Sequence, residues 1–306
     1  MLNLHIPNEI NRLRAVLVGT AISNGPIPTK EEAYDPSSLQ HILNGSYPLE
    51  EHMIAEMDAL VTVFEKYEVK VYRPEILKDC NQIFARDIAF VIGDKIFKSN
   101  ILPDRAKEFH AIEHVWDQVD KNNQIIWPDH IHMEGGDIMP WNKYIFVGTY
   151  SGEDYPDLIT ARTNIQAVDA LQKFFPDKEV RSFQLKKSNT NPLESALHLD
   201  CCFQPLGQGK ALMHKEGFLI DDERDWLINF IGEENIFFVS KEEMASMNCN
   251  VFSISPEVVI SEKHFYRLNY WLEEQGFTVE KIPYKEISKQ GGLLRCSTLP
   301  LIRDPI

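Results

Sequence analysis

The chain lacks the long apolar runs that mark a membrane-spanning protein. No stretch reaches the roughly eighteen consecutive apolar residues that a transmembrane helix requires. The N-terminus, MLNLHIPNEINRLRAVLVG, also lacks the basic start and the extended apolar core of a secretory signal peptide. We therefore expect a cytoplasmic protein that does not span a membrane.

Cysteine is scarce, with five residues among 306, and no two of them form a CxxC pair. A disulfide framework or a zinc knuckle requires an even number of cysteines at closer spacing. We therefore expect free thiols, four of which are typical of inert packing residues. These four are Cys80, Cys201, Cys202 and Cys249, and the fifth is Cys296.

An excess of basic residues is also missing, since 31 Lys and Arg face 46 Asp and Glu, for a formal charge of −15. Nucleic acids and anionic membranes attract proteins with basic patches, so neither is an expected partner. The acidic balance is compatible with a small cationic substrate. The sequence contains no GxxxxGK[ST], no GxGxxG after a strand, no GxSxG and no HExxH, and we predict no cofactor.

What the sequence does contain is one order of elements that recurs five times: strand, turn, strand, helix, strand. Each unit spans about 50 residues and is too small to bury its own apolar face, so the units should stack around a common axis. The predicted units are 14–19 with helix 49–67 and strand 69–73; 84–100, helix 103–119 and strand 124–127; 132–150, helix 157–175 and strand 179–185; 198–214, helix 221–231 and strand 235–240; and 248–261, helix 262–275 and strand 277–282.

A last strand, 293–303, is left to close against the first unit. This pattern predicts a closed, propeller-like α/β fold, and no linker divides residues 1–306 into separate domains. Two segments without a predicted helix or strand, 21–47 and 186–193, are each long enough to cover a central site.

The polar residues that could carry chemistry stand early in the first strand of a unit, or on the closing strand. In a closed ring those strands face the axis, so their side chains should converge on one pocket. The residues are Asp87, Glu134, His198, Asp200 and Cys296. Because strand side chains alternate, the sequence His-Leu-Asp at 198–200 predicts an imidazole and a carboxylate on one face, which suits an acid/base pair.

The carboxylate of Asp87 lies in the apolar run FARDIAF, where burial is costly unless the charge is paired or bound to a cation. A structural ion pair with Arg86 or another arginine remains open. A competing interpretation is a metal hydrolase site of His130, His132, Glu134 and Asp137. The preceding Pro-Asp pair predicts a turn that leaves His130 exposed, so we favour the interpretation without a metal.

Five motifs in this order, FARD, MEGGD, ARTN, HLD and GGLLRCSTLPLIR, resemble the guanidine-modifying superfamily. This superfamily has the pentein fold, a five-bladed α/β propeller of pseudo-fivefold ββαβ repeats. It includes arginine deiminases, dimethylarginine dimethylaminohydrolases and amidinotransferases. The resemblance covers the chain from FARD to the C-terminus.

The resemblance implies a role for each matching residue. Cys296 would be the nucleophile, His198 the general acid/base and Glu134 the residue that orients the substrate nitrogen and the histidine. Asp87 and Asp200 would grip the guanidinium. The remaining matches are Arg162, where relatives bind the substrate carboxylate, and Asp137 and Arg86 in supporting positions.

A guanidinium carbon is a poor electrophile, so its attack requires paired carboxylates and a strong nucleophile such as a thiolate. Carboxylates near the thiol disfavour its ionisation, which a bound cation or protonated His198 would offset. We expect a hydrolase or deiminase of arginine or a derivative, acting through a covalent amidino-thioether, because the CSTLPLIR segment resembles that branch. An amidinotransferase remains an alternative, because LVTVFEKYEVKVYRP and ARDIAFVIGD resemble that branch. The non-enzymatic alternative is a pentein-fold binding protein, and the number of subunits stays open.

Overall fold

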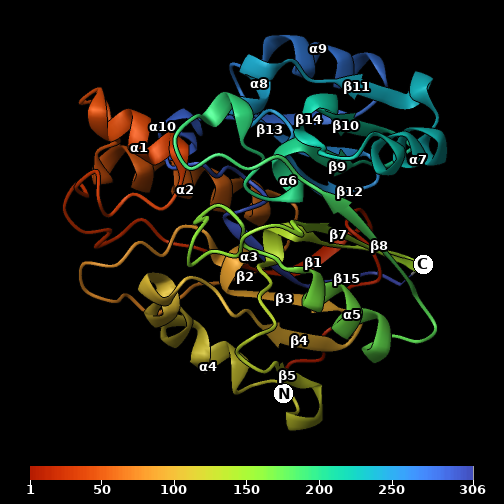
Figure 1. Ribbon diagram of the computed structural model, residues 1–306, viewed down its shortest axis with the longest axis horizontal. Helices are drawn as coiled ribbons and strands as arrows, with labels where there is room; N and C mark the ends of the chain where they lie inside the picture. The colour runs from red at the N-terminus through yellow and green to blue at the C-terminus, as the bar shows by residue number, and fades with distance from the viewer. Residues whose placement is uncertain (306) are drawn as a thin grey trace.

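The computed structural model describes residues 1–305. Within this range the strands form five small sheets of three strands each (Figure 1). In every sheet the first two strands are antiparallel and the second and third are parallel. The sheets are β15 (Thr298–Arg303), β1 (Leu13–Val18) and β2 (Lys70–Tyr72); β3 (Ala89–Ile92), β4 (Lys95–Lys98) and β5 (Gln124–Ile126); β6 (Ile138–Trp141), β7 (Tyr144–Thr149) and β8 (Glu179–Gln184); β9 (Phe203–Pro205), β10 (Ala211–Met213) and β11 (Ile236–Phe238); and β12 (Phe252–Ser255), β13 (Val258–Glu262) and β14 (Thr278–Ile282).

Helices connect the two parallel strands of each sheet, because parallel neighbours need a crossover rather than a tight turn. They are α2 (Glu50–Lys66), the 3₁₀ helix η1 (Pro103–Ile112) continued by α4 (Glu113–Trp116), α5 (Ile165–Phe174), α7 (Asp221–Ile231) and α9 (Tyr266–Glu274). Figure 1 shows α4, α7 and α9 toward the outside of the molecule and the short helices α3 (Ala85–Ile88) and α6 (Leu199–Cys202) toward its middle. The five predicted units are therefore present in the predicted order.

The ring closes as predicted, because the C-terminal strand β15 pairs with the N-terminal strand β1 from Leu13↔Arg303 to Val18↔Thr298. Figure 1 shows the blue strand beside the red one. A buried ionic cluster supports this closure: Glu9 accepts from Arg295 at 3.1 and 3.2 Å, and Arg86 lies 3.9 Å away. The closing strand thus places the residues just before it in the centre of the ring.

The apolar pattern of the sequence accounts for the core. On α2 the buried side chains recur three or four residues apart, at Met53, Met57, Leu60 and Phe64, so one face of the helix packs inward. The largest hydrophobic cluster includes these residues together with side chains from β1, β7, β9 and β12. Among the described residues, none of the helices is both long and apolar enough to cross a membrane.

Several predicted boundaries are wrong, and local hydrogen bonds explain them. The helix expected over 157–175 begins only at Ile165, because the Asn164 side chain caps it by accepting from the backbone N–H of Ala167. The segment 21–47, expected to be irregular, contains α1 (Pro36–Leu43), whose N-cap Asp35 accepts from Ser38 at 2.8 Å. The first part of the helix expected over 103–119 is 3₁₀ rather than α.

Two further short helices were not predicted, α8 (Lys241–Ala245) and α10 (Lys285–Ser288). Ser240 and Glu243 form a capping box at the start of α8, a signal that the sequence contains. The start of α10 depends on Glu56 of α2, which accepts from the backbone N–H groups of Glu286 and Ile287 at 2.9 Å each. Because this contact joins segments that are far apart in the sequence, no local sequence pattern predicts it.

Candidate active site

The predicted polar residues do meet at the centre, but they do not lie on strands. Asp87 lies in the one-turn helix α3, Asp200 lies in α6, and His198 is the N-cap of α6. The prediction that alternation along a strand places His198 and Asp200 on one face is therefore wrong. The segments that carry these residues come together around one axis. Each of them turns just before the first strand of its sheet, and the turn directs the side chains inward.

The close packing of these turns explains the two glycines of the MEGGD motif. These glycines belong to the 3₁₀ helix η3 (Gly135–Asp137), which follows Glu134. A Cβ on Gly135 would lie 2.1 Å from the carbonyl oxygen of Arg86, and one on Gly136 would lie 2.6 Å from Nδ1 of His198. Glycine is therefore required for close approach rather than for a special backbone angle.

His198 is buried among carboxylates. Its Nε2 lies 2.8 Å from Oε2 of Glu134, and its Nδ1 lies 3.8 Å from Oδ1 of Asp87. Burial opposes the charged imidazolium, but Asp87, Asp137 and Glu134 outweigh it and raise the pKa of His198 to about 9. The imidazole is consequently protonated at neutral pH and can donate a proton.

Arg162 completes this group. Its Nη1 lies 3.1 and 3.2 Å from the two carboxylate oxygens of Glu134, and both side chains are fully buried. Burial would raise the pKa of Glu134, but Arg162 and the hydrogen bond with His198 hold it well below its usual range. Glu134 therefore stays a carboxylate between an arginine and a histidine.

Asp87 forms its ion pair with Arg105, not with the adjacent Arg86. Arg105 donates a hydrogen bond to Oδ2 of Asp87 at 2.8 Å. It donates two further hydrogen bonds to Glu108, of 2.8 and 2.9 Å. The other oxygen of Asp87, Oδ1, is buried and has no hydrogen-bond partner within residues 1–305. Sequence reasoning missed Arg105, and the only local signal is its i,i+3 spacing to Glu108.

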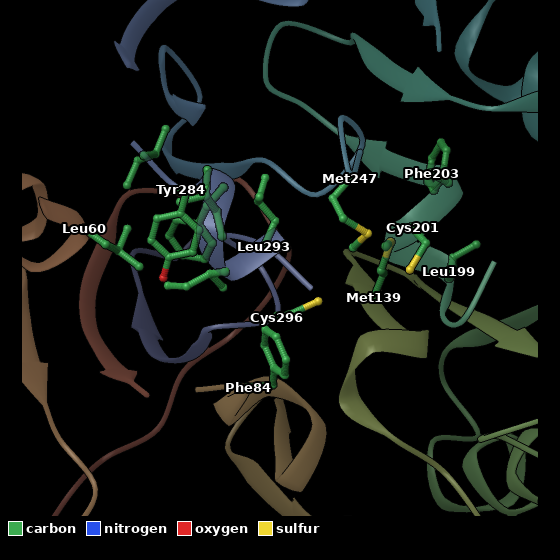
Figure 2. Close-up of a cluster of buried hydrophobic side chains, with 14 of the residues drawn as sticks. Leu60, Phe84, Met139, Leu199, Cys201, Phe203, Met247, Tyr284, Leu293 and Cys296 are labelled. Carbon is green, nitrogen blue, oxygen red and sulfur yellow. The ribbon is translucent and has the colours of Figure 1, made fainter. Parts of the chain in front are cut away.

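Cys296 lies in the turn just before β15 and is 3% exposed. Figure 2 shows it beside Phe84, at the edge of a cluster that includes Leu293 and Tyr284. Its Sγ lies 3.7 Å from Oδ2 of Asp200. Burial, and then the nearby carboxylates of Asp200 and Asp87, raise the pKa of the Cys296 thiol well above its ordinary value.

Two residues that sequence reasoning did not place in the site hold this turn. Arg295 donates to Asp200 at 2.9 Å and to the backbone carbonyl of Ile138 at 2.8 Å. Asn250 contacts Cys296 directly, at 3.2 Å between Nδ2 and Sγ. Asn250 stands two residues before β12, as Asp87 and Cys296 do before β3 and β15, and this equivalence could have identified it.

A small cavity lies beside part of this cluster, but Glu134, Asp200, Asn250 and Arg295 are not in its wall. Its walls are formed by Tyr34, Asp35, Phe84, Asp87, Arg105, Arg162, Leu197, His198, Gln290, Gly291, Gly292 and Cys296. Its volume of about 10 Å³ is close to the space for one water molecule. Tyr34 covers the cavity. The backbone carbonyl of Tyr34 accepts from Arg162 at 2.5 Å, and the Tyr34 ring lies 5.5 Å from the Arg105 guanidinium. A larger ligand therefore has to displace Tyr34.

Asp137 is buried and is not in the wall of this cavity. Its Oδ1 accepts from the backbone N–H of Leu199 at 2.9 Å and so fixes the segment that carries His198. Lys187 supports the same segment by donating to the carbonyls of Ala196 and Leu197 at 3.0 and 2.8 Å.

The metal site considered from the sequence does not form around His130 and His132. His130 is exposed, and His132 bonds Asp154 at 2.8 Å and stacks on Tyr155. Among the described residues, a different group could offer ligand atoms within 4.8 Å of one another: Asp87, Glu134 and His198. Arg105 and Arg162 already bind the two carboxylates, so a metal ion would compete with both arginines.

Comparisons with known proteins agree with the resemblance that the sequence motifs indicate. The family model described as N,N dimethylarginine dimethylhydrolase, eukaryotic, matches residues 40–303. The uncharacterized protein YkgA of Bacillus subtilis is 30% identical over 223 residues, which are 72% of this chain and 70% of that protein. The arginine deiminase of Borreliella afzelii is 25% identical over 268 residues, covering 74% of this chain but only 62% of the deiminase.

Solved structures share the fold. The N-terminal domain of ArgZ, an arginine dihydrolase from cyanobacteria, aligns with a TM-score of 0.77 at 18% identity and covers 94% of this chain and 98% of that one. Inosamine-phosphate amidinotransferase from Streptomyces griseus aligns with a TM-score of 0.76 at 15% identity, over 100% of this chain and 98% of that one. These likenesses confirm the predicted five-bladed α/β propeller.

Proposed function

Because the chain belongs to the N,N-dimethylarginine dimethylhydrolase family and is an enzyme of guanidino groups, we propose that it is a cysteine-dependent hydrolase of arginine or an arginine derivative. One observation carries the proposal. The thiol of Cys296, the protonated imidazole of His198 and the unpaired Oδ1 of Asp87 line a single buried cavity. A guanidinium placed there would meet a carboxylate, a nucleophile and a proton donor.

In the proposed reaction the substrate guanidinium binds to Asp87 and Asp200. The bound cation offsets the carboxylates that disfavour the Cys296 thiolate, so the thiol loses its proton to solvent, and its sulfur attacks the guanidino carbon. His198 donates its proton to the departing nitrogen as the C–N bond breaks, which leaves an amidino-thioether. Water then attacks that carbon while His198 takes up a proton, and the C–S bond breaks to release the product.

Two features support this sequence of steps. The paired carboxylates and the cationic His198 provide the charge stabilisation that a poor electrophile requires. The N-terminal domain of ArgZ has been solved covalently bound to a reaction intermediate, and it shares this fold.

The other end of the cavity suits an amino acid. Arg105 and Arg162 lie in its wall, and Arg162 could bind a substrate carboxylate after the Tyr34 carbonyl is displaced. Asp35 lies in the same wall; its Oδ1 caps α1, while its buried Oδ2 has no partner within the described chain. We assign Oδ2 to the α-ammonium group of the substrate.

Amidino transfer to an amine is the second candidate, because the Streptomyces griseus amidinotransferase aligns over the whole chain. Both reactions share the covalent intermediate and differ in whether water or an amine attacks it. Hydrolysis is placed first because the family model that matches residues 40–303 is that of a dimethylhydrolase.

Product analysis separates these reactions. The purified enzyme is incubated with arginine, methylated arginines and agmatine, each with and without glycine or ornithine, and the products are identified by mass spectrometry. We expect citrulline, or ornithine with a urea-type product, without any acceptor. Guanidinoacetate that forms only with glycine would instead establish transfer, and full turnover by Cys296→Ser would refute the cysteine mechanism.

A further inference from the structure

Asn250 lies directly against the proposed nucleophile and is fully buried. Its Oδ1 accepts from the backbone N–H of Arg295 at 2.9 Å and from that of Cys296 at 3.2 Å. Its Nδ2 lies 3.2 Å from Sγ of Cys296 and 3.4 Å from the carbonyl oxygen of Asp200. One carboxamide therefore contacts both the backbone and the sulfur of the cysteine.

The orientation of this carboxamide follows from its partners. Two backbone N–H groups face one end of it, and an N–H group can only donate, so the atom at that end is the oxygen. The other end faces the carbonyl of Asp200, which can only accept. The NH₂ group of Asn250 is thus directed at Sγ as a donor.

A donor at this position matters to the thiol, because nearby carboxylates disfavour the thiolate. Asp200 lies 3.7 Å from Sγ, and Asp87 adds a second carboxylate nearby. Arg295, the preceding residue, is already bound to Glu9 and to Asp200. A hydrogen bond from Asn250 is strongest when the sulfur is charged, so it favours the reactive form.

We propose that Asn250 is a catalytic residue whose side-chain N–H stabilises the Cys296 thiolate and whose side-chain oxygen fixes the turn that presents it. This inference rests on the proposed role of Cys296 as the nucleophile. It concerns a property of the thiol that can be measured without any substrate.

The test is the rate at which iodoacetamide alkylates Cys296 at a fixed neutral pH, followed by mass spectrometry of the peptide that contains it. Below the thiol pKa this rate is proportional to the fraction of thiolate. Loss of a hydrogen bond to a charged group corresponds to a pKa shift of about 1–2 units, so Asn250→Ala should slow alkylation about 10- to 100-fold. A merely structural role predicts the opposite, since a loosened turn would expose the buried sulfur and speed alkylation.

Asn248→Ala provides a matched control, because Asn248 is also buried and lies two residues away. It should alkylate at the wild-type rate. If Asn250→Ala does not fold, Asn250→Leu takes its place, since it fills a similar volume and removes the donor without adding a charge. A rate equal to or above that of the wild type in the folded variant would overturn the proposal. Failure of the wild type to turn over any guanidino compound would refute the proposed function without changing this result.

Discussion

The buried cluster around Glu9 predicts a large loss of stability when its charge is removed. Glu9 is 3% exposed and accepts two hydrogen bonds from Arg295, the shorter of 3.1 Å, while Arg86 stands 3.9 Å away and Arg303 is also near. At the 3.1 Å that separates Glu9 from Arg295, the attraction between two opposite charges is about 5 kcal/mol at an effective dielectric constant of roughly 20. Loss of one partner of a buried pair costs about 3–5 kcal/mol, because the remaining charge is left uncompensated.

We therefore expect Glu9→Gln to lower the free energy of unfolding by about 3–5 kcal/mol, measured by urea denaturation. Within residues 1–305, the exposed Glu31 pairs only with the exposed Lys30, so the control Glu31→Gln should change the free energy of unfolding by less than about 0.5 kcal/mol. A loss below about 1 kcal/mol in Glu9→Gln would refute the reasoning.

A second variant tests the electrostatic cause. Without Glu9, the positive charges of Arg86, Arg295 and Arg303 repel one another, and Asp200 offsets only part of them. Burial, and then Arg295, lower the pKa of Arg86 to about 9 even in the intact protein. Adding Arg86→Met to Glu9→Gln should therefore restore part of the lost stability, and a further loss of the same size as the first would contradict a charge-based explanation.

Three further predictions concern the site. In the folded protein the pKa of His198 is raised from 6.5 to about 9. Protonated His198 therefore contributes its full stabilisation below about pH 6.5, and this stabilisation is lost as the pH rises through 9. In urea titrations at several pH values, His198→Gln should abolish this dependence of the free energy of unfolding on pH. Activity should fall over the same alkaline range, because the imidazole loses the proton that it donates. Gly136→Ala should reduce kcat about 100-fold with little change in the amount of folded protein, because its Cβ would displace His198. Asp35→Asn, which preserves the helix cap, should lower the preference for arginine over 5-guanidinopentanoate in kcat/KM, and an unchanged preference would refute the ammonium assignment.

The chain order of the fold could be predicted from the sequence because it depends on local patterns. Alternating and helical apolar spacing identified the five units. The helix 221–231 was predicted with its observed bounds. The boundaries that failed, such as the start of α5, were decided by a capping side chain.

The convergence of Asp87, Glu134, His198, Asp200 and Cys296 was also predictable, because the sequence places each of them at the start of a unit or of the closing strand. Their local conformation was not, since short turns and one-turn helices replace the expected strands. Crowding at the axis causes this difference, and crowding is a property of the assembled ring.

The sequence by itself determined the repeat, the closure of the ring and the identity of the side chains at its centre, because periodicity and order along the chain carry that information. Only the tertiary structure decided the partners: Arg105 rather than Arg86 for Asp87, Glu9 for Arg295, and Asn250 for Cys296. Glu9 and Arg295 stand 286 positions apart. Such pairs follow from which segments meet in three dimensions, and no spacing along the chain encodes a contact across a closed ring.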